Sequence, residues 1–75
     1  MRYYFHISMK GVVIRDQEGT ELSSVQDAKR EAAAIATELR LNFPAQCDET
    51  GMILVRKEGG DFAFGSPIMS TAYAC

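Results

Sequence analysis

The only histidine of the chain, His6, is the side chain best suited to proton transfer near neutral pH. A general base needs an orienting partner and a reacting group, and the sequence shows neither a serine motif nor a nucleophilic cysteine signature to serve with it. A histidine packed on a sheet face beside Tyr4, or between two subunits, explains the same residue with fewer assumptions. An enzyme built around His6 is therefore the weakest interpretation, and we predict that the chain is not an enzyme.

An acidic cluster surrounds Gly19 and consists of Asp16, Glu18 and Glu21. Carboxylates in a short loop can bind a cation, but the Asp-x-[Asp/Asn]-x-[Asp/Asn]-Gly spacing of a calcium loop is absent. The alternative is a polar connection that turns at Gly19 and leads into a helix cap. We favour the turn, and we expect no metal and no cofactor.

Two other features have simple structural explanations. Gly59-Gly60 lacks the Lys and Ser/Thr of a phosphate loop, so it predicts a hairpin turn. Cys47 stands directly before two acidic residues, which disfavour a reactive thiolate, and Cys75 is poorly placed for a structural disulfide. There is no CxxC motif to support a metal site. We therefore expect reduced thiols and a cytoplasmic protein.

Basic and aromatic side chains alternate along residues 2–8, which have the pattern of a half-buried strand. One face carries Arg2, Tyr4 and His6, and the other carries Tyr3, Phe5 and Ile7. Arginine and aromatic side chains on a sheet can stack the bases of single-stranded RNA. The net charge is −2 and the eight basic residues are spread along the chain, so nucleic acid is an unlikely partner. A protein interface explains the same face.

The hydrophobic pattern predicts four strands and one helix. The strands are expected at residues 2–8, 12–15, 52–57 and 62–65, and glycine-containing turns separate the members of each pair. Ser24-x-x-Asp27 has the form of a capping box before an apolar stripe. The stripe consists of Val25, Ala28, Ala32, Ile35, Ala36 and Leu39. Its spacing predicts a helix at residues 24–41, and Pro44 prevents its continuation.

These elements predict an α+β fold with the order β-β-α-β-β. Its four-stranded antiparallel sheet has the strand order 2-1-3-4, and one helix lies on one face. The domain is expected to span residues 1–65 and to be followed by a weakly ordered tail, residues 66–75. One helix cannot cover both sheet faces, and an exposed apolar sheet face commonly marks an interface. The predicted interface residues are Tyr4, His6, Ile53 and Val55.

The size of the chain points to a partner subunit. Seventy-five residues, 47% of them hydrophobic, form one small domain. So short a chain often needs a disulfide, a metal or a second subunit to be stable. Because the first two lack support, we predict a homodimer. No apolar run approaches the roughly 18 residues of a membrane span. The chain enters a strand at Arg2, so we expect no signal peptide and no membrane association.

The opening residues, Met-Arg-Tyr-Tyr-Phe-His, resemble the start of a family of short bacterial proteins of unknown function. The resemblance continues through Asp16-x-Glu18-Gly19-x-Glu21-Leu22 and through Ala28-Lys-Arg-Glu-Ala32. It covers residues 1–40 well, whereas the rest matches only in its hairpin pattern. The turn at residues 9–11 departs from the acidic turn of the family. The resemblance implies the fold, and it brings no established activity.

A looser similarity connects the chain with antitoxin domains of the HicB type. The shared features are an opening hairpin, an acidic connection with a glycine and an alanine-rich helix. Such domains form a partial ribonuclease-H-like sheet and bind a small toxin protein. The chain lacks their Pro-Asp-Leu-Pro-Gly-Cys type of segment and a separate DNA-binding module, so the similarity is one of fold. We predict a non-enzymatic cytosolic interaction module that dimerises through its uncovered sheet face and has an unidentified protein partner. An antitoxin-like or nucleic-acid-associated regulator is the alternative.

Overall fold

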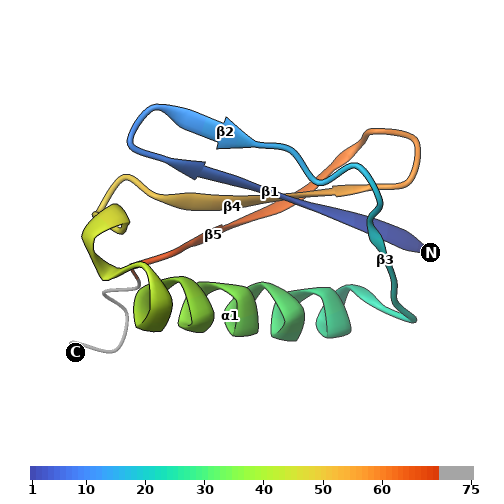
Figure 1. Ribbon diagram of the computed structural model, residues 1–75. Helices are drawn as coiled ribbons and strands as arrows, with labels where there is room; N and C mark the ends of the chain where they lie inside the picture. Colours follow the sequence, from blue (N-terminus) through green and yellow to red (C-terminus); the bar gives the residue numbers. More distant parts are fainter. Residues whose placement is uncertain (70–75) are drawn as a thin grey trace.

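The computed structural model describes residues 1–69, and it has the predicted α+β architecture. One antiparallel sheet lies on one helix (Figure 1). The strands are β1 (Arg2–Met9), β2 (Val12–Ile14), β3 (Thr20–Glu21), β4 (Met52–Lys57) and β5 (Phe62–Pro67). The helix α1 (Val25–Asn42) is followed by a short 3-10 helix, η1 (Pro44–Gln46). The path β2-β1-β4-β5 confirms the predicted order of the four expected strands.

The fifth strand, β3, was not expected from the sequence. It pairs with the start of β1, where Arg2 faces Glu21, whereas β2 pairs with the end of β1, where Ile7 faces Ile14. The edge of β1 that faces away from β4 is thus shared by two short strands, with residues 15–19 between them. A strand of two residues is too short to show an alternating pattern, so the sequence gives no signal for it.

The helix begins where its cap predicts. The Asp27 backbone N–H donates to Ser24 Oγ at 3.2 Å, and the first helical residue is Val25. At the other end the Phe43 N–H donates to the Leu39 carbonyl at 2.8 Å, and Pro44 then starts η1. The predicted range, residues 24–41, differs from the observed one by a single residue at each end.

The core lies between α1 and the sheet. Its buried members are Tyr3, Phe5, Ala28, Ala32, Ala36, Ile53, Val55 and Ile68. Three alanines on one helix face allow α1 to lie close to the sheet, where it packs on β4 and β5. Val25 was expected on the same stripe but is exposed, and it is the first residue of α1.

The domain extends beyond residue 65, which corrects the expected boundary. Strand β5 continues to Pro67, and the Ile68 side chain is fully buried. The Ile68 N–H donates to the Gly51 carbonyl at 3.1 Å, and Arg40 Nη1 donates to the Ile68 carbonyl. The sequence suggested an earlier end because proline and glycine both disfavour strands. Residues 70–75 of the expected tail, with Cys75, lie outside the described residues.

Candidate functional site

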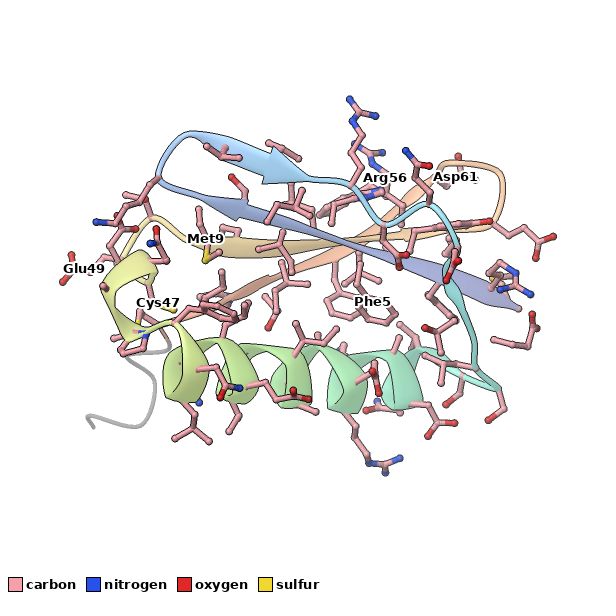
Figure 2. All side chains as sticks on the ribbon, in the orientation of Figure 1. Phe5, Met9, Cys47, Glu49, Arg56 and Asp61 are labelled. Atoms are coloured by element: carbon pink, nitrogen blue, oxygen red, sulfur yellow. The ribbon has the colours of Figure 1, made fainter. Side chains whose placement is uncertain are left out.

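The sheet face turned away from α1 is the first candidate site, and we call it the open face. Tyr4, His6 and Ser8 of β1 lie opposite residues of β4 on this face. Its members are Tyr4, His6, Ser8, Val13, Arg15, Met52, Leu54, Arg56 and Phe62. Figure 2 shows Phe5 directed towards α1 and Arg56 directed away from it. Tyr4 and His6 therefore lie on the uncovered side of the sheet, where the sequence placed them.

Ile53 and Val55 do not lie on the open face, which corrects half of the predicted interface. Both are fully buried beneath α1, where they face Ile7 and Phe5 of β1. Successive side chains of a strand point to opposite faces, so Met52, Leu54 and Arg56 take the open side of β4. The sequence could not decide between the two sets, because the apolar run Met-Ile-Leu-Val contains no polar residue to mark the exposed side.

The centre of the open face contains a shallow hollow of about 180 Å³. It is lined by His6, Val13, Arg15, Leu54 and Arg56. Arg56 Nη1 donates to the Gly60 carbonyl at 3.0 Å, and neither arginine forms an ion pair within residues 1–69. Two cationic groups thus surround an apolar floor, an arrangement that suits an anionic group attached to an apolar one.

In the acidic segment at residues 16–21, Asp16 forms hydrogen bonds that connect this segment to β1. We call this set of hydrogen bonds the clasp. Asp16 Oδ2 accepts the Phe5 N–H at 3.1 Å, and Asp16 Oδ1 accepts the N–H groups of Glu18 and Gly19 at 3.2 and 3.0 Å. The Asp16 N–H donates to His6 Nδ1 at 3.0 Å. Asp16 thereby joins β1 to the segment between β2 and β3, where no strand pairing exists. This confirms the predicted turn at Gly19.

The hydrogen bonds of the clasp keep Asp16 ionised. Partial burial alone would raise the pKa of Asp16, but the N–H groups of Gly19, Phe5 and Glu18 hold this pKa below its usual value of 3.8. Glu21 forms an ion pair instead, with its Oε1 atom 3.8 Å from Arg2 Nη2. No group of three or more His, Cys, Asp or Glu side chains within residues 1–69 is arranged to hold a metal ion.

The clasp also fixes the tautomer of His6. Because Nδ1 accepts the Asp16 N–H, the neutral ring carries its proton on Nε2. The only acceptor nitrogen of the neutral ring is therefore occupied by backbone. Nε2–H remains as a hydrogen-bond donor beside the hollow, so the geometry suits ligand binding better than proton abstraction.

Gly59-Gly60 and Cys47 occupy structural positions. The two glycines have positive φ values of 96° and 97° and lie in the turn between β4 and β5, as predicted. Cys47 is partly buried at the end of η1, where its thiol donates to the Phe43 carbonyl at 3.5 Å.

A second surface, which we call the hairpin groove, was not foreseen from the sequence. It is a cavity of about 350 Å³ between the β1–β2 hairpin and the end of α1. Its lining consists of Met9, Lys10, Val12, Ile14, Leu39, Phe43 and Gln46. The groove exists because α1 packs on β4 and β5 and leaves β2 uncovered on the helix side. Which strands a helix covers is a tertiary property that hydrophobic periodicity does not encode.

Comparison with known proteins places the chain in a family. The family model described as domain of unknown function DUF6894 matches residues 2–69. No curated protein and no solved structure matches the chain. None of the helices within residues 1–69 is long and apolar enough to span a membrane. The family match extends from β1 to Met69 and thus includes every described element, beyond the stretch that carried the resemblance. The chain therefore belongs to the DUF6894 family, a family of uncharacterised small domains.

Proposed function

We propose that the chain is a small non-enzymatic interaction module of the cytoplasm, which acts as a homodimer and presents its open face to an acidic segment of a protein partner. The observation that supports this proposal most strongly is the hollow, where Arg15 and Arg56 surround an apolar floor. Uncovered apolar surface on a small domain usually serves binding. Arginine is enriched at protein interfaces, where its guanidinium group recognises carboxylates.

Charge favours an acidic partner over a second copy on this face. Two copies stacked through their open faces would bring Arg15 and Arg56 of each chain together, with no carboxylate among the residues that line the hollow. Like charges opposed across an interface cost several kcal/mol. An acidic segment with apolar neighbours instead neutralises both arginines and covers Val13 and Leu54.

The experiment is a charge-reversal test on the open face. The purified chain is immobilised, captured proteins are identified, and the strongest candidate is then titrated as a purified protein. We expect the double variant Arg15→Glu/Arg56→Glu to abolish binding, and we expect added salt to weaken it. The matched control is Arg30→Glu on the exposed side of α1, which should leave binding unchanged. Equal binding by the double variant and the unmodified chain would overturn the proposal.

A nucleic-acid-associated regulator, the role of HicB-type antitoxins included, is the second candidate. The observation in its favour is that Tyr4 and Phe62 share the open face with the two arginines, which resembles a stacking platform for unpaired bases. Fluorescence anisotropy with single-stranded RNA and duplex DNA at low salt tests this alternative. Saturable binding that Tyr4→Ala weakens would favour the regulator, and no binding at low salt would exclude it.

A further inference from the structure

We propose that two copies of the chain join by antiparallel pairing of their β2 strands, so that the two sheets become one. The proposal rests on the homodimer proposed above and names its contact surface. It leaves the open face of each copy free for the acidic partner.

The two outer strands of the sheet differ in a way that singles out β2. Strand β5 contains Gly65 and Pro67, and its pairing with β4 is interrupted by an irregularity between Val55 and Arg56. Proline, glycine and bulges are devices that keep an edge strand from pairing with other chains. Strand β2 contains none of them. Its three residues, Val12, Val13 and Ile14, are β-branched and each more than 50% exposed.

Within residues 1–69, the hairpin presents unpaired backbone groups at the centre of this edge. Lys10 and Gly11 both have positive φ, 49° and 78°, as in the two-residue turn that fits the twist of a hairpin. In such a hairpin the residues that flank the turn, Met9 and Val12, exchange backbone hydrogen bonds. The alternation of an antiparallel ladder then directs the N–H and C=O of Val13 away from β1. These two groups can pair with the same groups of a second copy.

The edge is self-complementary about Val13. With a two-fold axis at Val13, the antiparallel register places Val12 opposite the partner's Ile14 and Val13 opposite the partner's Val13. Lys10 then takes the register position opposite the partner's Asp16, whose carboxylate accepts N–H groups of its own chain. Arg15 takes the position opposite the partner's Gly11, so that no two cations are opposed across the contact.

The hairpin groove gives the pairing an apolar layer. Val12 and Ile14 point into the groove beside Leu39 and Phe43, and Phe43 is 56% exposed in the single chain. When the β2 strand of a second copy pairs here, the Val12 and Ile14 side chains of that copy lie next to these residues. The two grooves then adjoin across the two-fold axis and withdraw exposed apolar surface from water.

Light scattering between about 1 and 500 μM, a range that covers weak and moderately tight dimers, measures the oligomeric state. We expect a mass of twice 8.3 kDa at high concentration. Val12→Lys lies outside the open face, and Val13→Pro removes an N–H that faces away from β1, although it also changes a side chain that lines the hollow. Each should raise the dimer dissociation constant by about tenfold or more, since each removes a central contact. Phe62→Lys on the open face and Leu41→Lys on α1 are exposed controls that should dimerise normally.

Hydrogen exchange of the unmodified chain provides a second measurement that does not depend on any variant folding. We expect the Val13 amide to become more protected as concentration rises, while the exposed turn amides at Gly59 and Gly60 do not change. A monomer across the whole range would overturn the homodimer and this contact together. The other result is a dimer that dissociates in Phe62→Lys, stays intact in Val12→Lys and shows no added protection at Val13. That result would keep the homodimer and overturn β2 pairing.

Discussion

The side chain of Asp16 takes the place that a neighbouring strand would have beside β1. On the β1 edge that faces away from β4, no strand of residues 1–69 pairs with the stretch between β2 and β3, and the Asp16 carboxylate accepts the Phe5 N–H in place of a carbonyl. The same carboxylate closes the following turn through the N–H groups of Glu18 and Gly19. The sequence shows a polar loop with a glycine at this position, and only the three-dimensional structure shows that the loop is a substitute for sheet pairing.

Replacement of Asp16 by alanine is expected to cost about 1–3 kcal/mol of unfolding free energy, because three backbone N–H groups lose their acceptor. Urea unfolding at pH 7 measures the loss. Asp61→Ala removes an exposed carboxylate and should change stability by less than about 0.5 kcal/mol. A loss for Asp16→Ala no larger than that of the control would contradict the clasp.

Acid should remove the contribution of the Asp16 charge. The pKa of Asp16 is lower in the folded chain than in the unfolded chain, so the contribution is complete above about pH 4 and is lost as pH falls through the folded pKa. Asp16→Asn keeps the shape of the side chain but not its charge. The stability difference between the unmodified chain and Asp16→Asn should therefore shrink below about pH 4, as measured by urea unfolding across pH. A difference that grows with acid would show the opposite sign of shift.

Gly19→Ala should destabilise the fold by about 1–3 kcal/mol, since two separate costs add. Gly19 has φ of +72°, and a Cβ there would lie 2.8 Å from Arg2 Cγ and 3.0 Å from the Tyr3 carbonyl oxygen. Thermal unfolding measures the effect. Gly11→Ala is the matched control, because it has a similar φ of +78° and no atom near the new Cβ. An equal loss in both variants would mean that only φ matters at Gly19.

At the scale of elements, the alanines of α1 set the distance between helix and sheet. Ala32 is fully buried against the sheet, so Ala32→Leu should overpack the core and cost about 1–3 kcal/mol. The neighbouring Ala33 is exposed, and Ala33→Leu should change stability little. Chemical unfolding of both variants makes the comparison. Equal stability would show that the core accommodates a larger side chain and is less tightly packed than the burial of Ala32 implies.

Elements with strong local signals were predictable, and those determined by tertiary contacts were not. Ser24 and Pro44 mark the two ends of α1 through capping and backbone geometry, and both act locally. Strand β3 exists only because β1 is available to pair with it. The face to which Ile53 belongs depends on the register between β1 and β4. A one-residue change in register would exchange the two faces of β4, and the apolar run at residues 52–55 does not decide between them.

At the scale of the whole molecule, Ile68 completes the core from beyond the last strand. Ile68→Ala should cost about 2–5 kcal/mol, which is typical of a large side chain removed from a core. Met69→Ala is the control, because Met69 is 39% exposed and adjacent in sequence. Thermal and urea unfolding measure both. A small loss at Ile68 would restore the boundary that the sequence suggested near residue 65.

The candidate site, like the elements, could be predicted from the sequence only where a local pattern determines it. Alternation along β1 was enough to place Tyr4 and His6 on the uncovered face. The hollow required Arg15, which follows β2, and Arg56 of β4, which are far apart in sequence and come together only because β2 and β4 lie on either side of β1. To predict the hairpin groove one must know which strands α1 covers, and hydrophobic periodicity does not give this information.

The position of β1 in the sheet has a consequence for the synthesis of this protein. Among the described elements β1 precedes all others in the chain, yet its longest pairing is with β4, which ends at Lys57. Ile68, the last buried residue within residues 1–69, follows later still. Pairings between distant segments form slowly, and exposed strand edges promote wrong contacts meanwhile. A nascent chain therefore exposes β1 and the apolar edge of β2 until β4 has been translated, and this domain completes its fold only after Ile68 has been added.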